Sequence, residues 1–533
     1  MNDSLFFGRD DYLAILEKRA RDLKEGYRQN IAMVGEELVG KTSIIFRFLN
    51  RFHEPKIIPV YLEVRPESFE LFAKRFLGVL LYNFLSNSDL PLREDLDFLI
   101  EKSARYIPRT CDKIKNILIC LQKRKLAGLF TELLSLTECI YQETSKSCVV
   151  IFDEFHNLET LGIKKLYPEW SKLLLVQKNT LYIIVSSLKF KAQAILAKNL
   201  SLLFGNFEVI TVESFDLKTS ERYLNERLRG LPLDTGLKNF VIHFTGGHPF
   251  YLNLIAEELL KSPLTKATLP DIIENLLFSP SGILNQKFSN YLKRFLNVPH
   301  SQDYLSVLRM VASGHNRLKE IAHFLRKPQK NILPRINYLL ESDTLVRSGE
   351  FLTLNDRIFG FWLRFVHQEK LHSLTFNAHR QQGLFRENVE KMISEFLSCA
   401  EQPIVERMLE LLRLFDDDTI QIEKKKVRLT HFREIKPLEF GRNRIRDGLI
   451  GRSSDALWII AFKNEAVAEE DVVEFARECK RYRHAKLQRK ILVTAGDVDP
   501  NARLKAMEEK IWTWDLNNVN RILDLFLKPR VIA

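Results

Sequence analysis

The segment MVGEELVGKTSII, which begins at Met33, limits what the chain can fold into more than any other part of the sequence. Its spacing, G-x-x-x-x-G-K-[ST], is that of a phosphate-binding loop, in which glycines let successive backbone N–H groups surround a phosphate. The lysine of such a loop reaches the outer phosphates, and the hydroxyl residue holds Mg²⁺. The residues in these places are Gly35, Gly40, Lys41 and Thr42, followed by Ser43. We expect a nucleotide site here, and the plainer alternative is a structural glycine turn.

The sequence on either side of the loop supports the nucleotide interpretation. NIAMVG is a short apolar run that ends at the first glycine, and KTSIIFRFLNRF has the apolar spacing of a helix. The pattern is therefore strand, loop, helix, which arises by chance much more rarely than the loop spacing alone. Glu36 and Glu37 lie inside the loop, where their negative charge should repel a nucleotide unless both side chains turn to solvent.

A buried strand that ends in two acids follows farther along the chain, in SCVVIFDEFHNL. Asp153 is placed to hold Mg²⁺, usually through water, and Glu154 to orient or deprotonate the water that attacks the terminal phosphate. The alternative is a strand that simply runs into an acidic turn, which the preceding loop makes the weaker interpretation.

Three further apolar segments complete an alternation of strands and helices. KIIPVYLEV follows the loop helix, LYIIVSSLKF contains Ser186 and Ser187, and FEVITVESFD supplies a fifth strand. This order predicts an α/β fold with a parallel sheet. At the carboxyl edge of such a sheet one of the two serines would contact the terminal phosphate, or both would only cap the loop after the strand.

These residues resemble the archaeal-type STAND ATPases, relatives of AAA+ proteins, over the whole N-terminal half. Two more stretches carry the resemblance, FFGRDDYLAIL before the first strand and FTGGHPFYLNLIAEELL after the last. The resemblance implies an element beside the adenine and a second element, in a helical lid, that closes over the base. The implied residues are Phe7, Gly8 and Arg9 for the first, and Gly246, Gly247 and Pro249 for the second. Proline also suits a helix start, where its missing N–H costs nothing, so a plain lid-helix start is the alternative.

The chain departs from this family inside the loop, because basic residues are frequent there at the places of Glu36 and Glu37. We expect weaker affinity or an altered loop geometry, with ATP binding retained because the cradle is backbone. Since the lysine, the threonine and both strand-end acids are present, slow hydrolysis of ATP with Mg²⁺ is expected rather than none. The adenine elements favour ATP over GTP.

From Asp303 the pattern changes to three short helices and a hairpin with a turn at Gly349, which predicts a winged helix-turn-helix. Leu339, Leu340 and Leu345 would face its core. The third helix would carry basic and amide groups toward double-stranded DNA, or the domain would pack on a neighbour instead. The candidate DNA-binding residues are Lys327, Gln329, Lys330, Asn331 and Arg335.

Residues from about 375 onward predict another αβ unit, with adjacent strands in RNRIRDGLIG and ALWIIAFKNE and a crossover helix before KILVTA. This part resembles the restriction-endonuclease-like domain appended to many of these ATPases. The resemblance implies an acid on one strand and an E-x-K motif on the next. Asp447 occupies the place of the acid, and Lys463 occupies the place of the lysine in the motif. Ala461 stands where the second carboxylate should be, and the possible substitutes are Glu465, Glu387 and Glu390. We favour a catalytically inactive nuclease domain that acts as a binding or dimerisation platform. In this interpretation Asp447 is an acidic residue on the surface of a strand.

Composition excludes few classes of protein. A length of 533 residues exceeds what one core usually serves, so we expect several domains. The six cysteines form no C-x-x-C pair and no metal-ligand spacing, and we expect them to be reduced. The first residues lack a basic region followed by an apolar core, and no run approaches the roughly 18 apolar residues of a membrane span. We therefore expect a cytoplasmic protein without membrane contact. Its net charge of +12 favours anionic partners without proving nucleic-acid binding.

We predict a multidomain α/β chain with four parts. These are a P-loop ATPase core over 1–215, a helical lid over 216–298, a winged helix-turn-helix over 299–370 and a degenerate restriction-endonuclease-like domain over 375–533. The leading hypothesis is an ATP-dependent switch that couples the nucleotide state to DNA, to a protein or to a second copy of the chain. The alternatives are an ATP-regulated, metal-dependent DNA nuclease and a non-hydrolysing scaffold in which the loop acids have spoiled the nucleotide site.

Overall fold

The chain divides into two compact units, Met1–Ser214 and Phe215–Ala533. The computed structural model describes residues 6–86, 95–201, 207–231, 233–265, 268–296, 299–368, 378–422, 425–441, 444–445, 447–482 and 486–532. Within those residues, no helix is long and apolar enough to cross a membrane.

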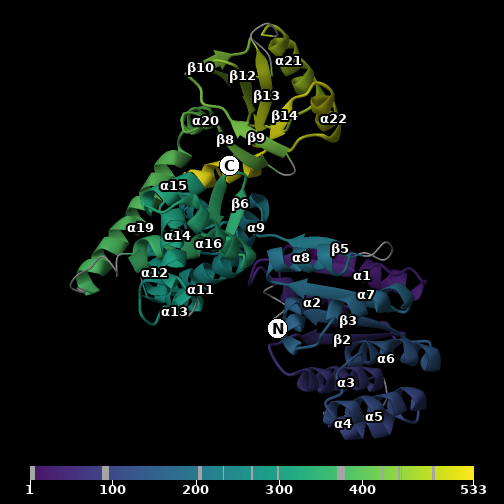
Figure 1. Cartoon of the computed structure of the whole chain (residues 1–533). Helices are drawn as coiled ribbons and strands as arrows, with labels where there is room; N and C mark the ends of the chain where they lie inside the picture. The colour runs from purple at the N-terminus through teal and green to yellow at the C-terminus, as the bar shows by residue number, and fades with distance from the viewer. Residues whose placement is uncertain are drawn as a thin grey trace. The chain divides into compact units, whose positions relative to one another are not determined.

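A five-stranded parallel sheet forms the centre of Met1–Ser214 (Figure 1). The strand order is β2-β3-β4-β1-β5. The strands are β1 (Ile31–Gly35), β2 (Ile57–Glu63), β3 (Ser147–Asp153), β4 (Thr180–Ser186) and β5 (Glu208–Val212). The sheet confirms the predicted parallel α/β core and fits a P-loop ATPase core. Because all five strands run the same way, the segments that follow β1, β3 and β4 meet at one edge.

Helices cover both faces of this sheet, so its central strands are fully buried. Ala32 and Val34 of β1 join one apolar core, while Ile31 and Met33 join the other. The first core contains side chains of α3 and α6, and the second contains side chains of α1 and α2. The helical elements are α1 (Asp10–Lys24), α2 (Lys41–Arg51), α3 (Phe69–Leu85), α4 (Leu96–Ser103), α5 (Pro108–Gln122), α6 (Leu129–Thr144), η2 (Phe155–Leu161), α7 (Leu166–Val176) and α8 (Lys189–Lys198).

The second unit, Phe215–Ala533, begins with helices. They are α9 (Leu217–Arg227), α10 (Thr235–Thr245), α11 (Pro249–Thr265), α12 (Leu269–Leu277) and α13 (Ile283–Leu296). Three helices and a hairpin follow, as predicted: α14 (Ser301–Ala312), α15 (Leu318–Phe324), α16 (Gln329–Glu341), β6 (Leu345–Ser348) and β7 (Phe351–Leu354). Leu339 and Leu345 are buried, Leu340 is half-buried, and Gly349 has a φ of 64° in the turn between β6 and β7.

The rest of this unit contains a mixed sheet in the order β10-β11-β12-β13-β14. The predicted neighbouring strands are β11 and β12, which pair antiparallel, and α21 crosses over to β13, which is parallel to β12. The elements are α17 (Arg357–Trp362), η3 (Leu363–His367), α19 (Ala378–Ala400), α20 (Ile404–Leu412), β8 (Asp418–Ile422), β9 (Lys425–Leu429), β10 (Glu434–Glu439), β11 (Asp447–Arg452), β12 (Leu457–Lys463), α21 (Glu469–Lys480), β13 (Leu487–Thr494), α22 (Pro500–Glu508), β14 (Trp512–Trp514) and α23 (Leu516–Leu525).

Helix α19, which opens the predicted fourth domain, packs against the lid helices α10 and α12. Phe396 stacks against His243 of α10 with ring centroids 4.9 Å apart, and Phe385 lies 5.4 Å from Phe278 at the end of α12. The predicted domain boundary at 370–375 lies outside the described residues and stays a prediction. The contacts of α19 described above are with helices that precede this boundary in the sequence.

Candidate functional site

The predicted phosphate loop connects β1 to α2. A Cβ added to Gly35 would overlap the carbonyl oxygen of Val212 on β5, so only glycine allows β1 and β5 to pair here. Gly40 has a φ of 102°, a conformation that favours glycine, and α2 begins at the next residue. The first N–H groups of a helix have no partner within it, so the start of α2 at Lys41, Thr42 and Ser43 can bind an anion.

The Lys41 side chain folds back onto this loop. Its ammonium donates to the carbonyl of Gly35 at 3.0 Å and to that of Glu36 at 2.6 Å, and only 4% of the residue is exposed. Burial lowers the pKa of Lys41, and nearby carboxylates oppose this effect, Glu154 most strongly. The lysine is thus held at the loop that the motif predicts it to serve.

The acid at the end of β3 meets the loop threonine. Thr42 Oγ1 donates to Asp153 Oδ2 at 2.7 Å, and the hydroxyl of Tyr61 on β2 donates to the same oxygen at 3.0 Å. Burial raises the pKa of Asp153, while the hydrogen bond from Thr42 lowers it. Mg²⁺ prefers oxygen ligands, so the Thr42 hydroxyl and the Asp153 carboxylate fit this ion. Tyr61 was not predicted, because its role depends on β2 lying next to β3.

Glu154 follows β3 in a left-handed conformation, with a φ of 53°. Its Oε2 accepts hydrogen bonds from the backbone N–H of Ser187 at 3.0 Å and from Ser187 Oγ at 2.7 Å. The segment after β4 therefore fixes one oxygen of the predicted catalytic carboxylate.

Ser186 is buried and contacts other parts of the protein. Its Oγ accepts from the backbone N–H of Leu188 at 3.1 Å and lies 2.8 Å from Nδ1 of His156. These contacts favour the loop-capping alternative for Ser186, and a contact of either serine with phosphate stays a prediction.

His156 is a site residue that sequence reasoning missed. Its Nδ1 lies 3.3 Å from Glu154 Oε2 as well as close to Ser186, so it connects the segment after β3 to the end of β4. Burial lowers the pKa of His156 to about 4, so the ring is neutral at pH 7. The only available signal was its place two residues after Glu154 in the DEFH segment.

Arg9 lies against the backbone of the loop. Its Nη2 donates to the carbonyl of Val39 at 3.2 Å and to that of Glu213, after β5, at 2.7 Å. Arg9 is 7% exposed and its guanidinium lies 5.5 Å from the ring centre of Tyr12. The residue therefore ties the loop to the end of β5. An adenine contact by Phe7, Gly8 and Arg9 stays a prediction.

The two loop acids have different environments. Glu37 is exposed to solvent, whereas Glu36 is half-buried and its carbonyl accepts from Lys41. Both carboxylates act on Lys41 in the direction that raises its pKa, more weakly than Glu154 and Asp153 do. Their negative charge therefore acts on Lys41, whose side chain stays hydrogen-bonded to the loop.

The predicted lid element lies in the second unit, in the turn between α10 and α11. Gly247 has a φ of 80°, and a Cβ there would overlap the carbonyl oxygen of Phe215. The carbonyl of Gly247 accepts from the N–H of Phe215 at 2.9 Å, Gly246 also has a positive φ, and Pro249 is the first residue of α11. The turn accounts for these residues structurally, and the contact of Pro249 with a base stays a prediction.

The candidate DNA-binding residues fall into two groups. Lys327 and Arg335 form ion pairs with Asp303 of α14. Gln329, Lys330 and Asn331 are exposed at the N-terminal end of α16. The ion pairs offset part of the charge that the sequence alone assigns to this surface.

The predicted nuclease positions lie on β11 and β12. Asp447 is exposed, Ala461 is buried opposite Gly448, and the Lys463 ammonium is bound to the buried carboxylate of Asp471 on α21. Glu465 is exposed, and Glu390 is bound to Arg386 on α19. Across the described ranges, no group of three or more His, Cys, Asp or Glu side chains is arranged to hold a metal ion.

Of the comparisons with known proteins, only the one with solved structures finds similar proteins. No protein-family model and no curated protein matches the chain. A Walker-type ATPase of Pyrococcus abyssi is 20% identical, with a TM-score of 0.48, over 67% of this chain and 96% of that one. The ORC2 protein of Aeropyrum pernix with ADPNP and ADP is 11% identical, with a TM-score of 0.37, over 72% and 94%. The ORC1 protein of the same organism with DNA is 11% identical, with a TM-score of 0.33, over 68% and 94%.

Proposed function

We propose that Met1–Ser214 binds ATP with Mg²⁺ and hydrolyses it slowly. The observation that carries this proposal is the hydrogen bond of 2.7 Å between Thr42 of the loop and Asp153 at the end of β3. It joins the hydroxyl and the carboxylate that share Mg²⁺ in phosphate-binding loops, although 111 residues separate them in the sequence.

Each residue of the site has a distinct role in this proposal. The N–H groups at the start of α2 bind the phosphates, and Lys41 leaves the loop carbonyls to contact the outer ones. Thr42 and Asp153 hold Mg²⁺, which when bound neutralises charge that develops on the phosphate oxygens. Glu154 orients the attacking water and accepts its proton.

Two features support a slow turnover. Ser187 donates two hydrogen bonds to Glu154 Oε2, so one oxygen of the proposed base is already engaged. Glu36 and Glu37 add negative charge at the loop, where the phosphates of ATP are also negative. Neither feature removes the backbone cradle, so binding is weakened less than catalysis.

The nucleotide state, in this proposal, controls what Phe215–Ala533 binds. Its three helices and hairpin are proposed as a winged helix-turn-helix, in which exposed Lys330 and its neighbours at the start of α16 contact double-stranded DNA. The domain around the C-terminal sheet is proposed to be a catalytically inactive nuclease domain that serves as a binding platform. The ion pair of Lys463 with buried Asp471 favours that interpretation over active cleavage, because it gives the lysine a structural partner.

Equilibrium titration with ATP and Mg²⁺ tests the binding step. We expect Lys41→Ala to weaken affinity by roughly 10- to 100-fold, because a charge-assisted hydrogen bond is lost. Lys18→Ala, an exposed lysine on α1, is the matched control and should bind like the wild type. Absence of ATP binding by the wild type would support the scaffold alternative, in which Glu36 and Glu37 have spoiled the site.

A further inference from the structure

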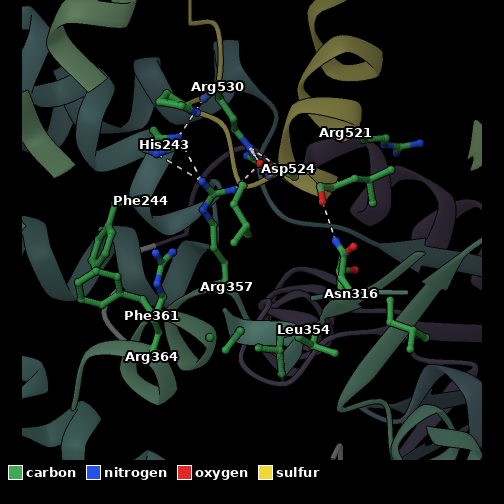
Figure 2. Close-up of a pocket in the computed structure, with 18 of the residues that line it drawn as sticks. His243, Phe244, Asn316, Leu354, Arg357, Phe361, Arg364, Arg521, Asp524 and Arg530 are labelled. Atoms are coloured by element: carbon green, nitrogen blue, oxygen red, sulfur yellow. Dashed lines mark hydrogen bonds and ion pairs between the residues drawn. The ribbon is translucent and has the colours of Figure 1, made fainter. Parts of the chain in front are cut away.

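A cavity of about 530 Å³ lies within Phe215–Ala533, and all the residues that line it belong to this unit. Its walls come from α10, from the α17–η3 segment, from the β6–β7 hairpin, from α19 and from α23 with the residues that follow it (Figure 2). Its volume falls within the roughly 300–1,000 Å³ of small-molecule pockets. The elements that line it are far apart in the sequence, so the cavity exists only in the folded unit.

Two guanidinium groups share one carboxylate in the cavity wall. Asp524 Oδ1 lies 2.5 Å from Arg357 Nη1, and Asp524 Oδ2 lies 2.7 Å from Arg530 Nη2. The three side chains are 32%, 22% and 21% exposed for Arg357, Asp524 and Arg530. The cluster therefore carries one excess positive charge at a half-buried place, where it attracts an anionic group.

His243 lies beside this cluster and does not balance it. Its Nδ1 accepts from the backbone N–H of Arg530 at 3.2 Å and lies 3.2 Å from Arg357 Nη2. Burial, together with the two arginines, holds the pKa of His243 well below its ordinary value. The ring is thus neutral, and the charge of the cluster stays positive.

Arg364 of η3 adds a further positive charge. Figure 2 shows its guanidinium extending from η3 toward the side on which His243 and Arg357 lie. Arg364 is exposed, and Glu395, which lines the cavity together with Asp524, is paired with Lys391 of α19. Arg364 can therefore bind a ligand with its whole guanidinium group. Arg357 and Arg530 can do so only in part, because both already contact Asp524.

One wall of the cavity is apolar. Phe244 and Phe361 contact each other edge-on, with ring centroids 5.2 Å apart, and Leu354 of β7 also lines the space. A few charged groups beside an apolar wall are typical of a site that orients a small organic ligand. Guanidinium groups are the side chains best suited to bind phosphate or carboxylate through paired hydrogen bonds.

We propose that this cavity binds a small organic anion, whose phosphate or carboxylate contacts Arg364 and the Arg357–Asp524–Arg530 cluster and whose apolar part lies on Phe361 and Leu354. The proposal is independent of nucleotide binding by the first unit. A bound anion would hold the lid helix α10, the hairpin, α19 and α23 together, and so stabilise the second unit.

Calorimetric titration of the whole chain tests the proposal with two minimal probes. Phenyl phosphate and phenylacetate each carry one ring and differ in the anionic group, so their relative affinities distinguish a phosphate ligand from a carboxylate ligand. Benzyl alcohol, which has the ring without the charge, is the control ligand. We expect at least one anion to bind with a Kd of about 1 mM or tighter, and benzyl alcohol to bind much more weakly.

Three variants locate the binding. Arg364→Gln should weaken the anion roughly tenfold or more through loss of a charge-assisted contact, whereas Arg503→Gln, an exposed arginine on α22, should not. Met392→Trp, which fills the cavity from α19 without changing its charge, should also abolish binding. The proposal is overturned if neither anion binds, or if Arg364→Gln and Met392→Trp both bind it as the wild type does.

Discussion

At the residue scale, Asp153 is the point where three elements of the first unit meet. Its carboxylate ends β3 and accepts hydrogen bonds from Thr42 of α2 and Tyr61 of β2. The carboxyl is only 2% exposed, and burial raises its pKa while the hydrogen bonds from Thr42 and Tyr61 oppose that effect. The proposed Mg²⁺ ligand is therefore held in position by the protein before nucleotide arrives.

Removing the Tyr61 hydroxyl should show how much this contact contributes. We expect Tyr61→Phe to lower the free energy of unfolding of the first unit by about 1–2 kcal/mol, because a buried hydrogen bond to a charged group is lost. Urea unfolding followed by circular dichroism measures the difference. Tyr82→Phe, whose residue is 39% exposed, is the matched control and should change stability little. Equal stability of both variants would show that Tyr61 does not support Asp153.

The environment of His156 predicts a dependence of stability on pH. Its pKa is about 4 in the folded state, below the ordinary value of 6.5, so the unfolded chain binds more protons between these values. The contribution of His156 is complete above pH 6.5 and is lost as the pH falls toward 4, by up to about 3 kcal/mol. Unfolding at a series of pH values should therefore give a shallower loss for His156→Asn than for the wild type. Parallel profiles would contradict the burial of a neutral His156.

Sequence reasoning named four of the residues that the structure brings together here and missed two, for a physical reason. Lys41 and Thr42 belong to a local motif, and Asp153 and Glu154 end an apolar strand, so their roles follow from short segments. Tyr61 and His156 act through neighbours that only the strand order brings close. Periodicity shows that a strand is buried, but it does not show which strand lies beside it.

At the element scale, the predicted phosphate loop depends on two glycines for different reasons. Gly35 is required because a Cβ would overlap a carbonyl of β5, while Gly40 is required by its positive φ and has open space around it. The first constraint concerns the pairing of two strands, and the second concerns the start of α2.

Alanine substitutions should separate these two constraints from the ordinary effect of removing a glycine. We expect Gly35→Ala to destabilise the first unit by about 2 kcal/mol or more through backbone displacement, and Gly40→Ala by about 1–2 kcal/mol through strain. Gly78→Ala lies inside α3 with no atom near the added Cβ and should stabilise by about 0.5–1 kcal/mol. Chemical unfolding compares the three. A neutral Gly35→Ala would show that β1 and β5 are less closely paired than described.

The clarity of the apolar pattern in each segment explains which elements could be predicted from the sequence. The buried strands and the crossover helix α21 were expected, since each has a clear apolar pattern. The hairpin of β8 and β9 and the short strand β14 were not, because most residues of β8 and β9 are polar or charged and β14 has three residues alone. Helix α19 was recognised as a helix, but its partners were not, because an apolar face does not specify what covers it.

At the scale of the whole molecule, we propose nucleotide chemistry for Met1–Ser214 and the binding of partners for Phe215–Ala533. Within the second unit, the charge distribution indicates which of the proposed DNA-binding residues is available to a duplex. Lys330 is exposed at the start of α16, whereas Lys327 is already paired with Asp303.

Binding of a labelled DNA duplex, measured by fluorescence anisotropy, tests this assignment. We expect Lys330→Ala to weaken binding several-fold and to reduce the salt dependence by about one counterion, and Lys327→Ala to have a smaller effect. Lys505→Ala on α22, whose ammonium is paired with Glu508, is the control and should behave like the wild type. Binding that is insensitive to Lys330 would favour a protein interface for this domain.

Phosphate release from ATP distinguishes a protein that hydrolyses the nucleotide from one that only binds it. Wild-type protein and Glu154→Gln are compared at ATP and Mg²⁺ concentrations at which both are shown by titration to be saturated. The account predicts slow release by the wild type and a loss of about 100-fold or more in the variant, with ATP binding retained, because Glu154 acts on the attacking water. Equal rates for the two proteins would contradict the catalytic role of Glu154, and a wild type that binds ATP without releasing phosphate would contradict hydrolysis itself.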